Sequence, residues 1–469
     1  MESSSLHTCY SEAGQGHVFE AWASLSPEER AALLQEAGQI NLAQIDQLYR
    51  DLAVGHADSG QSDACLEPIE RDLVVDREAL PEAEKAELRA MGLQLIRDGR
   101  VAVVVLAGGQ GTRLGSDRPK GEFDIGLPSG KSIFQILTER FLKAQRLAGP
   151  SERCKMLVMT SGINHEQTKE FFEEHKYFGA LAENVVFFQQ AMLPLISKEG
   201  KILMESPSKM MLGPNGNGAL FDAVNRNPEV KAVLESIDYV QVIGVDNVLN
   251  RLLDPLYFGF TAKNQLQAAM KSVVKRDARE PVGVVVKKRV GSSLKYDIVE
   301  YSEIGEADVT AIDEATGELK FNLGNILVFV LKADKLLELA NKTETLNTLY
   351  HVAFKRNSYW DGTQQVKPAA PNSYKFELFL HNFLPFCERL GVMRVKREEE
   401  FAPVKNAEGV DSPQSARELV FAQSRRWLAK AGIDVGDRPV EVDVLLSYEG
   451  EGLEGVTVEP GKGPLHVIA

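Results

Sequence analysis

The stretch VAVVVLAGGQGTRLGSDRPKG, residues 101–121, joins an apolar run to a loop rich in glycine and basic residues. The run from Val101 to Leu106 contains no polar residue, which predicts a strand with both faces buried. Four glycines, two arginines and then Lys120 follow it. Glycine lets a backbone approach a ligand and turn N–H groups toward phosphate oxygens, and the basic side chains add positive charge. The stretch indicates an anion site at a strand end, although a strand-to-helix turn with surface basic residues would use the same residue types.

The two best-known phosphate loops do not fit this part of the chain. In GxxxxGK[ST] four residues separate the glycines, whereas three separate Gly126 from Gly130, which precedes Lys131. In GxGxxG the third glycine would have to stand where the chain has Leu114. The sequence therefore has neither a P-loop nor a dinucleotide fingerprint, which argues against a nicotinamide-dependent dehydrogenase.

Apolar runs of strand length recur along the chain, and helix-like stretches such as 131–148 and 165–175 lie between several of them. The runs cover residues 101–106, 155–159, 184–188, 239–245, 282–286 and 326–331. This alternation predicts an α/β fold, with a mixed, mainly parallel sheet flanked by helices on both faces. Such sheets bind ligands at the carboxyl ends of their strands, which is where the glycine loop begins.

A chain of 469 residues is too long for one ordinary core, so we expect more than one domain. Residues 1–100 are expected to be mainly helical, with a helix start at Ser26. Residues 101–400 contain the apolar strands, and residues 401–469 contain one helix, at 413–431, before a glycine-rich tail. The sequence thus predicts a helical N-terminal domain, a central sheet domain and a small C-terminal domain.

Composition limits the expected partners and compartment. The net charge of −14 argues against binding to nucleic acid through its phosphates. The four cysteines show no CxxC spacing, which argues against a zinc site and a disulfide framework and fits a reducing compartment. The chain does not begin with a basic segment followed by an apolar run, and no apolar run approaches membrane-spanning length. We expect a cytoplasmic protein that binds neither nucleic acid nor membrane.

The segment LAGGQGTRLGSDRPKG resembles the signature of the sugar-nucleotide pyrophosphorylases, L-x-G-G-x-G-T-R-[LM]-x(n)-P-K. Further blocks, between about residues 101 and 455, are similar to the eukaryotic-type UDP-N-acetylhexosamine pyrophosphorylases and occur in that family's order. They include PKGEFDIGLPSGKSIFQI, FFQQAMLP, PNGNGALF, VDN, FNLGNI and SYEGEGLE. The chain is identified as a member of this UDP-N-acetylglucosamine pyrophosphorylase family.

The resemblance implies a GT-A-like nucleotide-binding fold and a uridylyl transfer. UTP and N-acetylglucosamine 1-phosphate would give UDP-N-acetylglucosamine and pyrophosphate, with Mg²⁺ or Mn²⁺ as the cofactor. The sugar phosphate would attack the α-phosphorus directly, without a covalent intermediate or a general base, so catalysis would consist of positioning and charge stabilisation. We expect a monomer or weak homo-oligomer whose partners are these two substrates.

The resemblance also assigns catalytic and metal-binding residues. Arg113 and Lys120 match positions that hold the departing pyrophosphate, and Lys405 matches a lysine near the phosphates. Fixed cations there would stabilise the charge that develops in the transition state. Asp246 matches a carboxylate beside the metal, and carboxylates are usual partners of Mg²⁺. Taken alone, Lys405 would be a solvated surface lysine and Asp246 a helix N-cap.

The remaining positions implied by the family bind the substrates. They are Leu106, Ala107, Gly108, Gly109, Gln190, Gly216, Asn217, Glu300, Tyr301, Asn325, Lys375 and Phe379. The backbone at 106–109 would contact the uridine, and the amide of Gln190 would read the uracil edge. The segment at 216–217 would contact the nucleotide and sugar, and Glu300, Tyr301 and Asn325 would line the sugar pocket. Phe379 would lie near the acetamido group, and Lys375 near the phosphates.

The same residues have simpler explanations when the family is set aside. Gln190 would be a solvated residue at a strand end, Phe379 would belong to the core, and Lys375 would be solvated on the surface. The segment 214–221 would be an ordinary turn, for which Asn-Gly is well suited.

Three positions depart from the family pattern, namely Ala191, Ala219 and Leu323, and none of them removes a functional group. Leu323 replaces a small residue that adjoins the family's sugar pocket. N-acetylgalactosamine 1-phosphate and glucose 1-phosphate therefore stay open as alternative substrates. A non-catalytic sugar-nucleotide sensor is a further alternative, which the retained basic and acidic residues disfavour.

Overall fold

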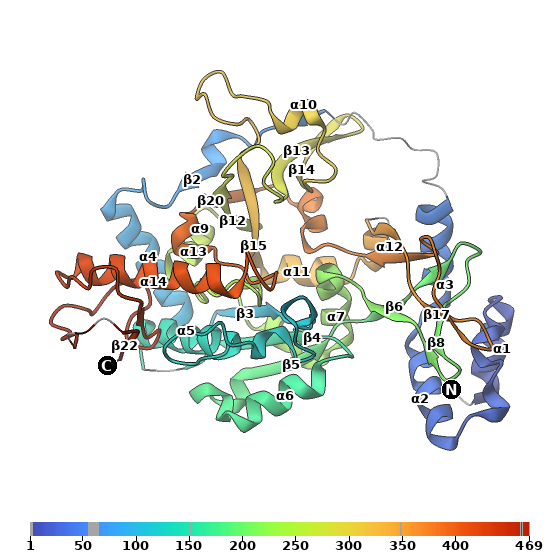
Figure 1. The fold of residues 1–469 in the computed structure, drawn as a ribbon. Helices are drawn as coiled ribbons and strands as arrows, with labels where there is room; N and C mark the ends of the chain where they lie inside the picture. Colours follow the sequence, from blue (N-terminus) through green and yellow to red (C-terminus); the bar gives the residue numbers. More distant parts are fainter. Residues whose placement is uncertain are drawn as a thin grey trace. The chain divides into compact units, whose positions relative to one another are not determined.

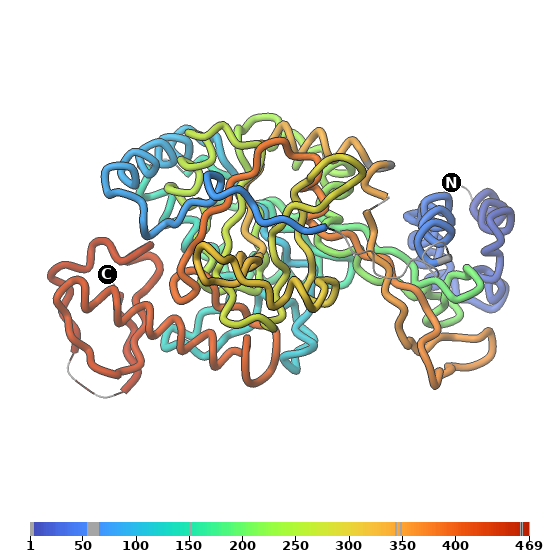
Figure 2. Tube along the Cα trace, turned by 90° about the horizontal axis from the view of Figure 1, so that it is seen from above, coloured from blue at the N-terminus to red at the C-terminus, as the bar shows by residue number. Residues whose placement is uncertain are grey.

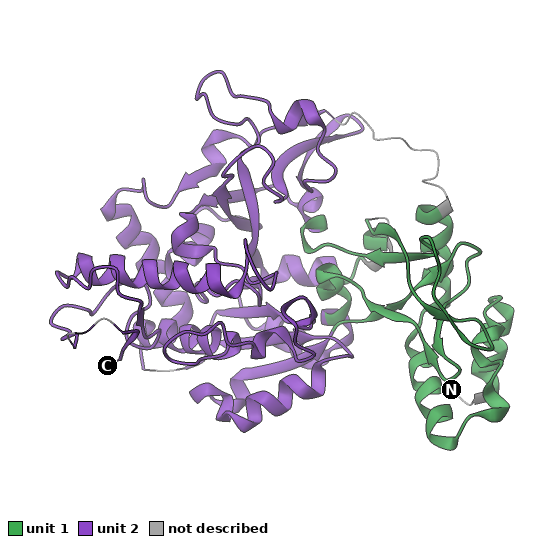
Figure 3. Ribbon diagram, viewed as in Figure 1, with its two compact units in different colours: residues 1–62, 190–223, 340–382 green, residues 63–189, 224–339, 383–469 purple. Residues whose placement is uncertain are grey.

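The computed structural model of the chain describes residues 3–54, 65–150, 152–347, 349–459, 461 and 463–468. Its contacts divide the chain into two compact units (Figure 3). Unit 1 comprises Met1–Ser62, Gln190–Ala223 and Ala340–Asn382, and unit 2 comprises Asp63–Gln189, Val224–Leu339 and Phe383–Ala469. Each unit is therefore assembled from segments that are far apart in the sequence.

Unit 2 is organised around an eleven-stranded sheet (Figure 1). Its strands are β1 (Leu66–Glu67), β2 (Val74–Asp76), β3 (Val101–Leu106), β4 (Lys155–Thr160), β5 (Val185–Gln189), β11 (Tyr239–Gly244), β12 (Ala268–Val274), β13 (Val284–Val290), β14 (Ser293–Val299), β15 (Leu323–Lys332) and β20 (Leu390–Arg394). The main path runs β2-β20-β12-β15-β11-β3-β4-β5, and β13 pairs with β15, β1 and β14. Only β15 is antiparallel to its neighbours on the main path, β11 and β12. The expected mixed, mainly parallel sheet is confirmed.

The α-helices follow the strands in alternation over much of the chain. They are α1 (Ser3–Glu12), α2 (Pro27–Gln39), α3 (Leu42–Leu48), α4 (Glu82–Arg97), α5 (Ile133–Ala148), α6 (His165–Glu174), α7 (Leu220–Arg226), α8 (Pro228–Glu235), α9 (Pro255–Lys263), α10 (Glu306–Val309), α11 (Ala333–Ala340), α12 (Thr343–Asn347), α13 (Arg397–Glu400) and α14 (Pro413–Lys430). The strands and helices expected within residues 101–431 all form, with ends shifted by a few residues at most.

Strand β3 is buried on both faces, as its unbroken apolar sequence predicts. Every residue of the strand is 8% exposed or less. Val101, Val103 and Val105 pack in one cluster with residues of α4, α5 and α9. Ala102 and Val104 point to the opposite face of the sheet because side chains alternate along a strand, and both are fully buried. A strand with two covered faces has no position at which a polar side chain would reach water.

Helices α4 and α9 cross in backbone-to-backbone contact at two glycines. A Cβ on Gly92 of α4 would lie 1.8 Å from the carbonyl oxygen of Pro255, and a Cβ on Gly259 of α9 would lie 1.8 Å from that of Leu88. No larger residue fits either position without separating the helices. This crossing fixes the start of α9, where Asp254 caps the helix by accepting from the N–H groups of Leu256 and Tyr257.

The C-terminal residues, red in Figure 2, form a small lobe of their own at the end of α14. Two short parallel strands, β21 (Val440–Val442) and β22 (Leu465–Val467), pack with Trp427 and Leu428 of α14 in a separate hydrophobic cluster. The lobe is tied to the segment before α5 by Lys131, whose Nζ lies 2.5 Å from a carboxylate oxygen of Asp443.

Unit 1 combines the first three helices with small antiparallel sheets. Strands β16 (His351–Lys355), β19 (Ser373–Glu377) and β7 (Ile196–Ser197) form one sheet, and β18 (Gln365–Val366), β17 (Tyr359–Trp360), β8 (Met204–Ser206) and β9 (Lys209–Met210) form another. Strands β6 (Met192–Pro194) and β10 (Leu212–Pro214) form a pair. Helix α2 begins at the expected Ser26, whose side chain accepts from the N–H of Glu29 while the Glu29 carboxylate accepts from the N–H of Ser26.

The division into units differs from three domains in sequence order. The first helices group with later segments of the chain in unit 1, whereas β1, β2 and α4 belong to unit 2 and the C-terminal lobe groups with the sheet. Strands β1 and β2 have two and three residues, too few for a periodic pattern to distinguish them from a loop. Which distant segments pair is decided by tertiary contacts that a sequence pattern does not encode.

Candidate functional site

The glycine loop begins where β3 ends, between the ends of its two parallel neighbours. The N–H of Ala107 donates to Met159 at the end of β4, and the N–H of Val245, just after β11, donates to Leu106. The loop then folds back on itself, because the N–H of Lys120 donates to the carbonyl of Gly109 at 3.2 Å. The return brings Lys120 beside the start of the loop.

Two buried polar residues after β4 hold the first carbonyls of this loop. The Asn164 amide donates to the carbonyls of Ala107 at 2.8 Å and Gly109 at 3.3 Å, and the Ser161 hydroxyl donates to Gly108 at 2.8 Å. The Asn164 Oδ1 accepts from the N–H of Ser161 at 2.9 Å. Neither side chain is exposed to solvent. Three successive carbonyls are thus turned into the protein by one asparagine and one serine.

Turning the carbonyls inward leaves N–H groups of the loop available. Among the residues that the structure describes, the N–H groups of Gly108, Gly109 and Gln110 donate to no acceptor. Gly109 is exposed, and a Cβ built on it would meet nothing within 4 Å. A run of unbonded N–H groups at a strand end is an arrangement that binds anions.

The basic residues of the loop differ in their partners. Arg118 forms an ion pair of 2.7 Å with Glu122. Arg113 is exposed and Lys120 is half-buried, and in the described part of the chain neither has a carboxylate within ion-pair distance. Two unpaired cations beside unbonded N–H groups mark a local positive site in a protein of net charge −14.

Asp246 lies two residues beyond β11, whose last residue, Gly244, pairs with Leu106 at the end of β3. Its carboxylate is half-buried and has no hydrogen bond or ion pair to any described residue. The helix-cap explanation is wrong, since the next helix, α9, begins at Pro255 and is capped by Asp254. The Asp246 carboxylate is therefore free to accept a ligand.

Gly244 is required by the side chains that fold over it. A Cβ there would lie 2.9 Å from Oδ1 of Asp246 and 2.9 Å from a methyl carbon of Leu327. Leu327 has a left-handed φ of 56° at a bulge of β15, where the pairing shifts between Met270 and Ser272 of β12. The backbone of β15 is thus strained beside the end of β11.

Lys405 lies on a segment that runs against the turn holding Asp246. The N–H of Val404 donates to the carbonyl of Asp246 at 2.9 Å, and Asn247 pairs with Pro403 in an antiparallel bridge. The Lys405 side chain is 43% exposed, with its Nζ 3.8 Å from a carboxylate oxygen of Asp411. The structure thus places Lys405 next to Asp246, although they are far apart in the sequence.

Glu300 and Asn325 meet at Gly283. The N–H of Asn325 donates to the carbonyl of Gly283 at 2.8 Å, and a Cβ on Gly283 would lie 3.0 Å from Oε1 of Glu300. The Oδ1 of Asn325 accepts from the N–H of Leu327 at 3.0 Å. Tyr301 is 56% exposed. Unit 2 therefore brings Glu300 and Asn325 together and leaves Tyr301 mostly in solvent.

Leu323 lines a cavity of about 320 Å³ in unit 2. Asp76, Asn322 and Arg394 also line it, whereas Glu300, Tyr301 and Asn325 do not.

Gln190 follows β5 directly and is only 7% exposed. Its Oε1 has no hydrogen-bond partner among the described residues. A buried polar atom without a partner costs free energy, so it indicates a position where a ligand or a water completes the hydrogen bonding. The solvated-glutamine explanation is wrong, because the side chain is buried.

The glycine loop of unit 1, at residues 216–218, packs against the end of β19. Gly216 has a left-handed φ of 83°, and a Cβ there would lie 2.5 Å from the carbonyl oxygen of Leu378. The Oδ1 of Asn217 accepts from the N–H of Leu380 at 2.7 Å, and the N–H of Gly218 donates to Leu378 at 2.8 Å. Asn217 is thereby held beside Phe379, with its amide N–H₂ free of partners in the described residues.

The ring of Phe379 is half-buried, with the ring centroids of His351 at 4.5 Å and His381 at 5.3 Å. It is therefore not a core residue. Lys375 also lies in unit 1, on β19, where its Nζ is 2.5 Å from Oε1 of Glu377. Its charge is already paired, unlike those of Arg113 and Lys120.

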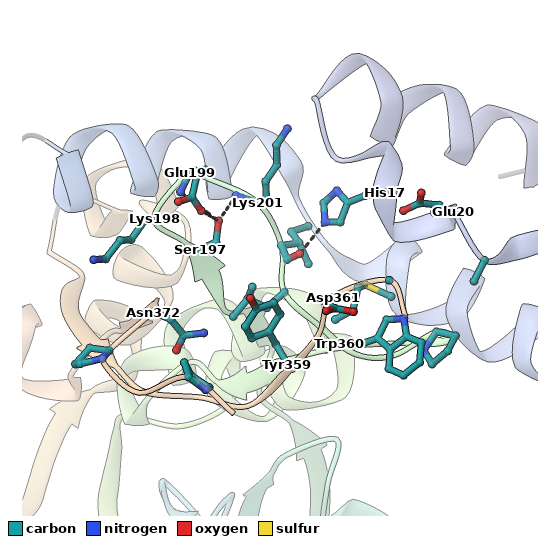
Figure 4. Close-up of a pocket in the computed structure, with 18 of the residues that line it drawn as sticks. His17, Glu20, Ser197, Lys198, Glu199, Lys201, Tyr359, Trp360, Asp361 and Asn372 are labelled. Atoms are coloured by element: carbon teal, nitrogen blue, oxygen red, sulfur yellow. Dashed lines mark hydrogen bonds between the residues drawn. The ribbon is translucent and has the colours of Figure 1, made fainter. Parts of the chain in front are cut away.

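Unit 1 also contains a cleft of about 780 Å³ (Figure 4). Tyr359, Trp360 and Asp361 come from one segment, and His17 lies across from them, hydrogen-bonded to the carbonyl of Ile202 at 2.7 Å. Lys201 points away from them, and its Nζ donates to the carbonyl of Gly14 at 2.6 Å. None of the predicted site residues lines this cleft. Acidic and basic side chains both surround it, so its charge favours no particular ligand.

Ser161, Asn164 and Gly283 contribute to these arrangements without having been singled out in the sequence. A signal for the first two existed, because they follow an apolar strand as polar residues and strand ends are where such sheets bind ligands. Gly283 has no such signal, since its role depends on the approach of Glu300. No group of three or more metal-ligating side chains occurs in the residues described, and no helix there is long and apolar enough to cross a membrane.

Comparisons with known proteins add to this geometry. Residues 46–439 match the family model described as UTP–glucose-1-phosphate uridylyltransferase. The chain is 38% identical to UDP-N-acetylglucosamine diphosphorylase 2 of Arabidopsis thaliana, an alignment that covers 94% of this chain and 89% of that protein. It is 36% identical to UDP-N-acetylglucosamine pyrophosphorylase of Saccharomyces cerevisiae, with 94% of each covered.

A solved structure shares the fold over nearly the whole chain. The uridine diphosphate N-acetylglucosamine pyrophosphorylase from Trypanosoma brucei, in complex with an inhibitor, superposes with a TM-score of 0.84 at 30% identity. The match covers 96% of this chain and 93% of that one.

Proposed function

Because the chain belongs to the UTP–glucose-1-phosphate uridylyltransferase family, among the eukaryotic-type UDP-N-acetylglucosamine pyrophosphorylases, we propose that it transfers a uridylyl group from UTP to N-acetylglucosamine 1-phosphate. The products are UDP-N-acetylglucosamine and pyrophosphate. Relatives that carry this activity in their names match the chain from near one end to the other.

The observation that carries the proposal is the anion site at the end of β3. It combines the unbonded N–H groups of residues 108–110 with the unpaired charges of Arg113 and Lys120. N–H groups can bind phosphate oxygens without a counter-charge of their own, and the two cations offset part of the negative charge of a pyrophosphate. A turn with a purely structural role would not need both unbonded N–H groups and unpaired cations.

In the proposed reaction the protein supplies position and charge. The phosphate oxygen of the sugar phosphate attacks the α-phosphorus of UTP, the bond to the β-phosphate oxygen breaks, and pyrophosphate leaves in line. Arg113 and Lys120 hold the pyrophosphate as its negative charge increases, and Lys405 holds the phosphates from the neighbouring segment. A phosphate dianion is already a nucleophile, so no side chain has to remove a proton.

Asp246 is the proposed metal ligand. Its unbonded carboxylate beside Lys405 fits Mg²⁺, which takes one or two carboxylates and completes its shell with phosphate oxygens and water. The absence of a three-ligand cluster in the described residues fits a metal that arrives with the nucleotide. Bound there, Mg²⁺ or Mn²⁺ would neutralise phosphate charge.

The base and the sugar are assigned to separate groups of residues. In unit 1, the buried Oε1 of Gln190 is proposed to pair with the uracil edge. In unit 2, the backbone from Leu106 through Gly109 is proposed to contact the uridine. Glu300 and Asn325 in unit 2 are proposed to contact the sugar, with Tyr301 beside them. In unit 1 the proposed contacts are made by Gly216, Asn217, Lys375 and Phe379.

Steady-state release of pyrophosphate tests the proposal. UTP should be used far better than CTP, because a site built to hydrogen-bond one base edge leaves its polar groups unpaired with the other. N-acetylglucosamine 1-phosphate should have a higher kcat/KM than glucose 1-phosphate or N-acetylgalactosamine 1-phosphate. Equal rates with UTP and CTP would remove the role of Gln190, and a preference for glucose 1-phosphate would overturn the assigned sugar.

A further inference from the structure

Asn247 is the residue through which the turn carrying Asp246 contacts the segment carrying Lys405. It is 2% exposed and uses the whole hydrogen-bonding capacity of its amide. Toward its own turn, Nδ2 donates to Oδ1 of Asn250 at 2.9 Å and Oδ1 accepts from the N–H of Leu249 at 3.2 Å. The other half of its bonds crosses to a distant part of the chain.

The crossing bonds end on the segment that leads to Lys405. Nδ2 of Asn247 donates to the carbonyl of Glu400 at 2.7 Å, and Oδ1 accepts from the N–H of Ala402 at 2.8 Å. The N–H of Val404 then donates to the carbonyl of Asp246. One side chain therefore aligns two backbones, and Asp246 and Lys405 lie immediately beside the aligned residues.

The segment is also fixed at both ends. At its start, the Glu400 carboxylate pairs with the fully buried Lys271, whose Nζ also lies 2.6 Å from Asp254. At its other end, the N–H groups of Lys405 and Asn406 both donate to the carbonyl of Asp411. Between these anchors, the side chain of Asn247 joins the segment to the turn, together with two backbone bonds, from the N–H of Val248 to the carbonyl of Ala402 at 3.3 Å and from the N–H of Val404 to that of Asp246.

We propose that Asn247 is a positioning residue that holds Lys405 at a fixed distance from Asp246. The proposal rests on the proposed function for its catalytic consequence, but the alignment itself can be tested without activity. Asparagine suits the position because it offers two donors and an oxygen on a short stem, so that each backbone receives one donor and one acceptor. Aspartate would lose the donor to Glu400, and alanine would lose every bond.

The test compares Asn247→Ala with Asn250→Ala. Asn250 lies in the same turn and is equally buried, and its amide donates to Gly244 at 2.8 Å, but it makes no bond to residues 400–404. Amide hydrogen exchange followed by mass spectrometry should show the N–H groups of Ala402 and Val404 exchanging roughly tenfold faster in Asn247→Ala than in Asn250→Ala, since local protection reports the lost bonds. Similar exchange of Ala402 and Val404 in both variants would overturn the proposal.

Kinetics supply the second measurement. Asn247→Ala should lower kcat about tenfold to a hundredfold, the scale on which misplaced groups act, while the KM for UTP stays within about twofold because the glycine loop is held separately. Asn250→Ala should lose about threefold or less. A large rise in the KM for UTP with unchanged kcat would contradict the positioning role.

Asn247→Asp keeps the proposal testable if the alanine variant does not fold. It retains the acceptor for Ala402 but turns an oxygen toward the carbonyl of Glu400 in place of a donor, so exchange at Ala402 and Val404 should still rise and kcat should still fall. Its added negative charge would by itself tighten Mg²⁺ binding and lower the Mg²⁺ concentration that gives half the maximal rate. A raised midpoint would therefore mean that Asp246 and Lys405 have been displaced from each other, which would support the proposal. A parent inactive with UTP and N-acetylglucosamine 1-phosphate would refute the proposed function alone, and the exchange result would still decide the role of Asn247.

Discussion

The glycine loop after β3 and the junction of Asp246 with Lys405 lie at neighbouring strand ends of one sheet, but they are held in different ways. The loop is continuous in sequence, closed by its own backbone and supported by the neutral side chains of Ser161 and Asn164. The junction joins two distant segments through Asn247 and rests on buried charges at Glu400. A local site can be recognised as a motif, whereas a junction becomes visible only when the chain is folded.

The largest effect should come from removing a cation of the loop. Lys120→Ala should lower kcat/KM by about a hundredfold to a thousandfold, because a fixed charge aimed at the leaving group stabilises the transition state. The melting temperature should change little, since Lys120 forms no ion pair with a described residue whose loss would lower stability. Arg118→Ala is the matched control, because Arg118 is already paired with Glu122. Equal kinetic losses in the two variants would show that Lys120 has no special role.

The next largest effect should come from Asp246→Asn, which changes the junction. The variant keeps the size and one oxygen but loses the charge, so metal binding should weaken. Losing about 3 kcal/mol of metal stabilisation would slow the reaction roughly a hundredfold. High Mg²⁺ should restore part of the rate in a titration against the parent, with melting curves as a control of folding. An unchanged Mg²⁺ midpoint would contradict metal binding at Asp246.

Asn164→Asp should have a smaller effect, confined to the loop. The new oxygen would face the carbonyls of Ala107 and Gly109 in place of a donor, so the loop would turn and its N–H groups would shift. The KM for UTP should rise about tenfold, the cost of one or two lost hydrogen bonds, with kcat less affected. This is the reverse of the pattern expected for Asn247, so a fall in kcat at constant KM would erase the contrast between the two regions.

The smallest effect should come from lowering the pH, which should destabilise the junction before the glycine loop. Burial alone would raise the pKa of Asp254, but Arg77 and Lys271 outweigh it and hold that pKa well below its usual range. Burial opposes ionisation of Glu400 too, and Lys271 and Arg251 likewise keep its pKa lowered. Both carboxylates therefore bind protons more readily when unfolded, so their stabilisation is complete above the ordinary carboxylate pKa of about 4 and is lost as the pH falls below it.

Each carboxylate should then cost up to about 1.4 kcal/mol per pH unit below that point. Amide exchange, corrected for intrinsic rates, should show Val404 losing protection as the pH falls below about 4, before Ala107 does. Lys271→Met/Glu400→Gln should flatten the acid dependence of the melting temperature. A parent and double variant with the same acid profile would mean that the buried charges do not set this behaviour.

Much of unit 2 was predictable because its signals are local. The apolar runs that form β3, β4, β5 and β11 need no information beyond a few neighbouring residues, and in unit 1 the same holds for the cap at Ser26. Strands β1 and β2 were not predicted, because so few residues carry no period and their pairing partners β13 and β20 lie far along the chain. The grouping of the N-terminal helices with residues 190–223 and 340–382 was not predictable for the same reason.

The site shows the same limit residue by residue. The role of the glycines and cations of the loop can be predicted from their own segment of sequence. The family resemblance assigns Asp246, Lys405 and the sugar residues, but it does not say how these residues are arranged in space. The structure adds that Asp246 is not a helix cap, that Gln190 is buried with an unpaired oxygen, and that Lys375 is paired with Glu377. Burial and pairing depend on what surrounds a side chain, which the sequence does not state.

The sequence by itself determined the doubly covered strand, the glycine loop after it, the acidic balance of the chain and the family. These properties are set by residue types and short spacings, because hydrophobic burial and backbone freedom act within a few residues. Only the tertiary structure decided which amide holds which backbone, as Asn164 holds the loop and Asn247 holds the segment of Lys405. Hydrogen bonds act over about 3 Å, so their partners are fixed only when folding brings distant segments that close.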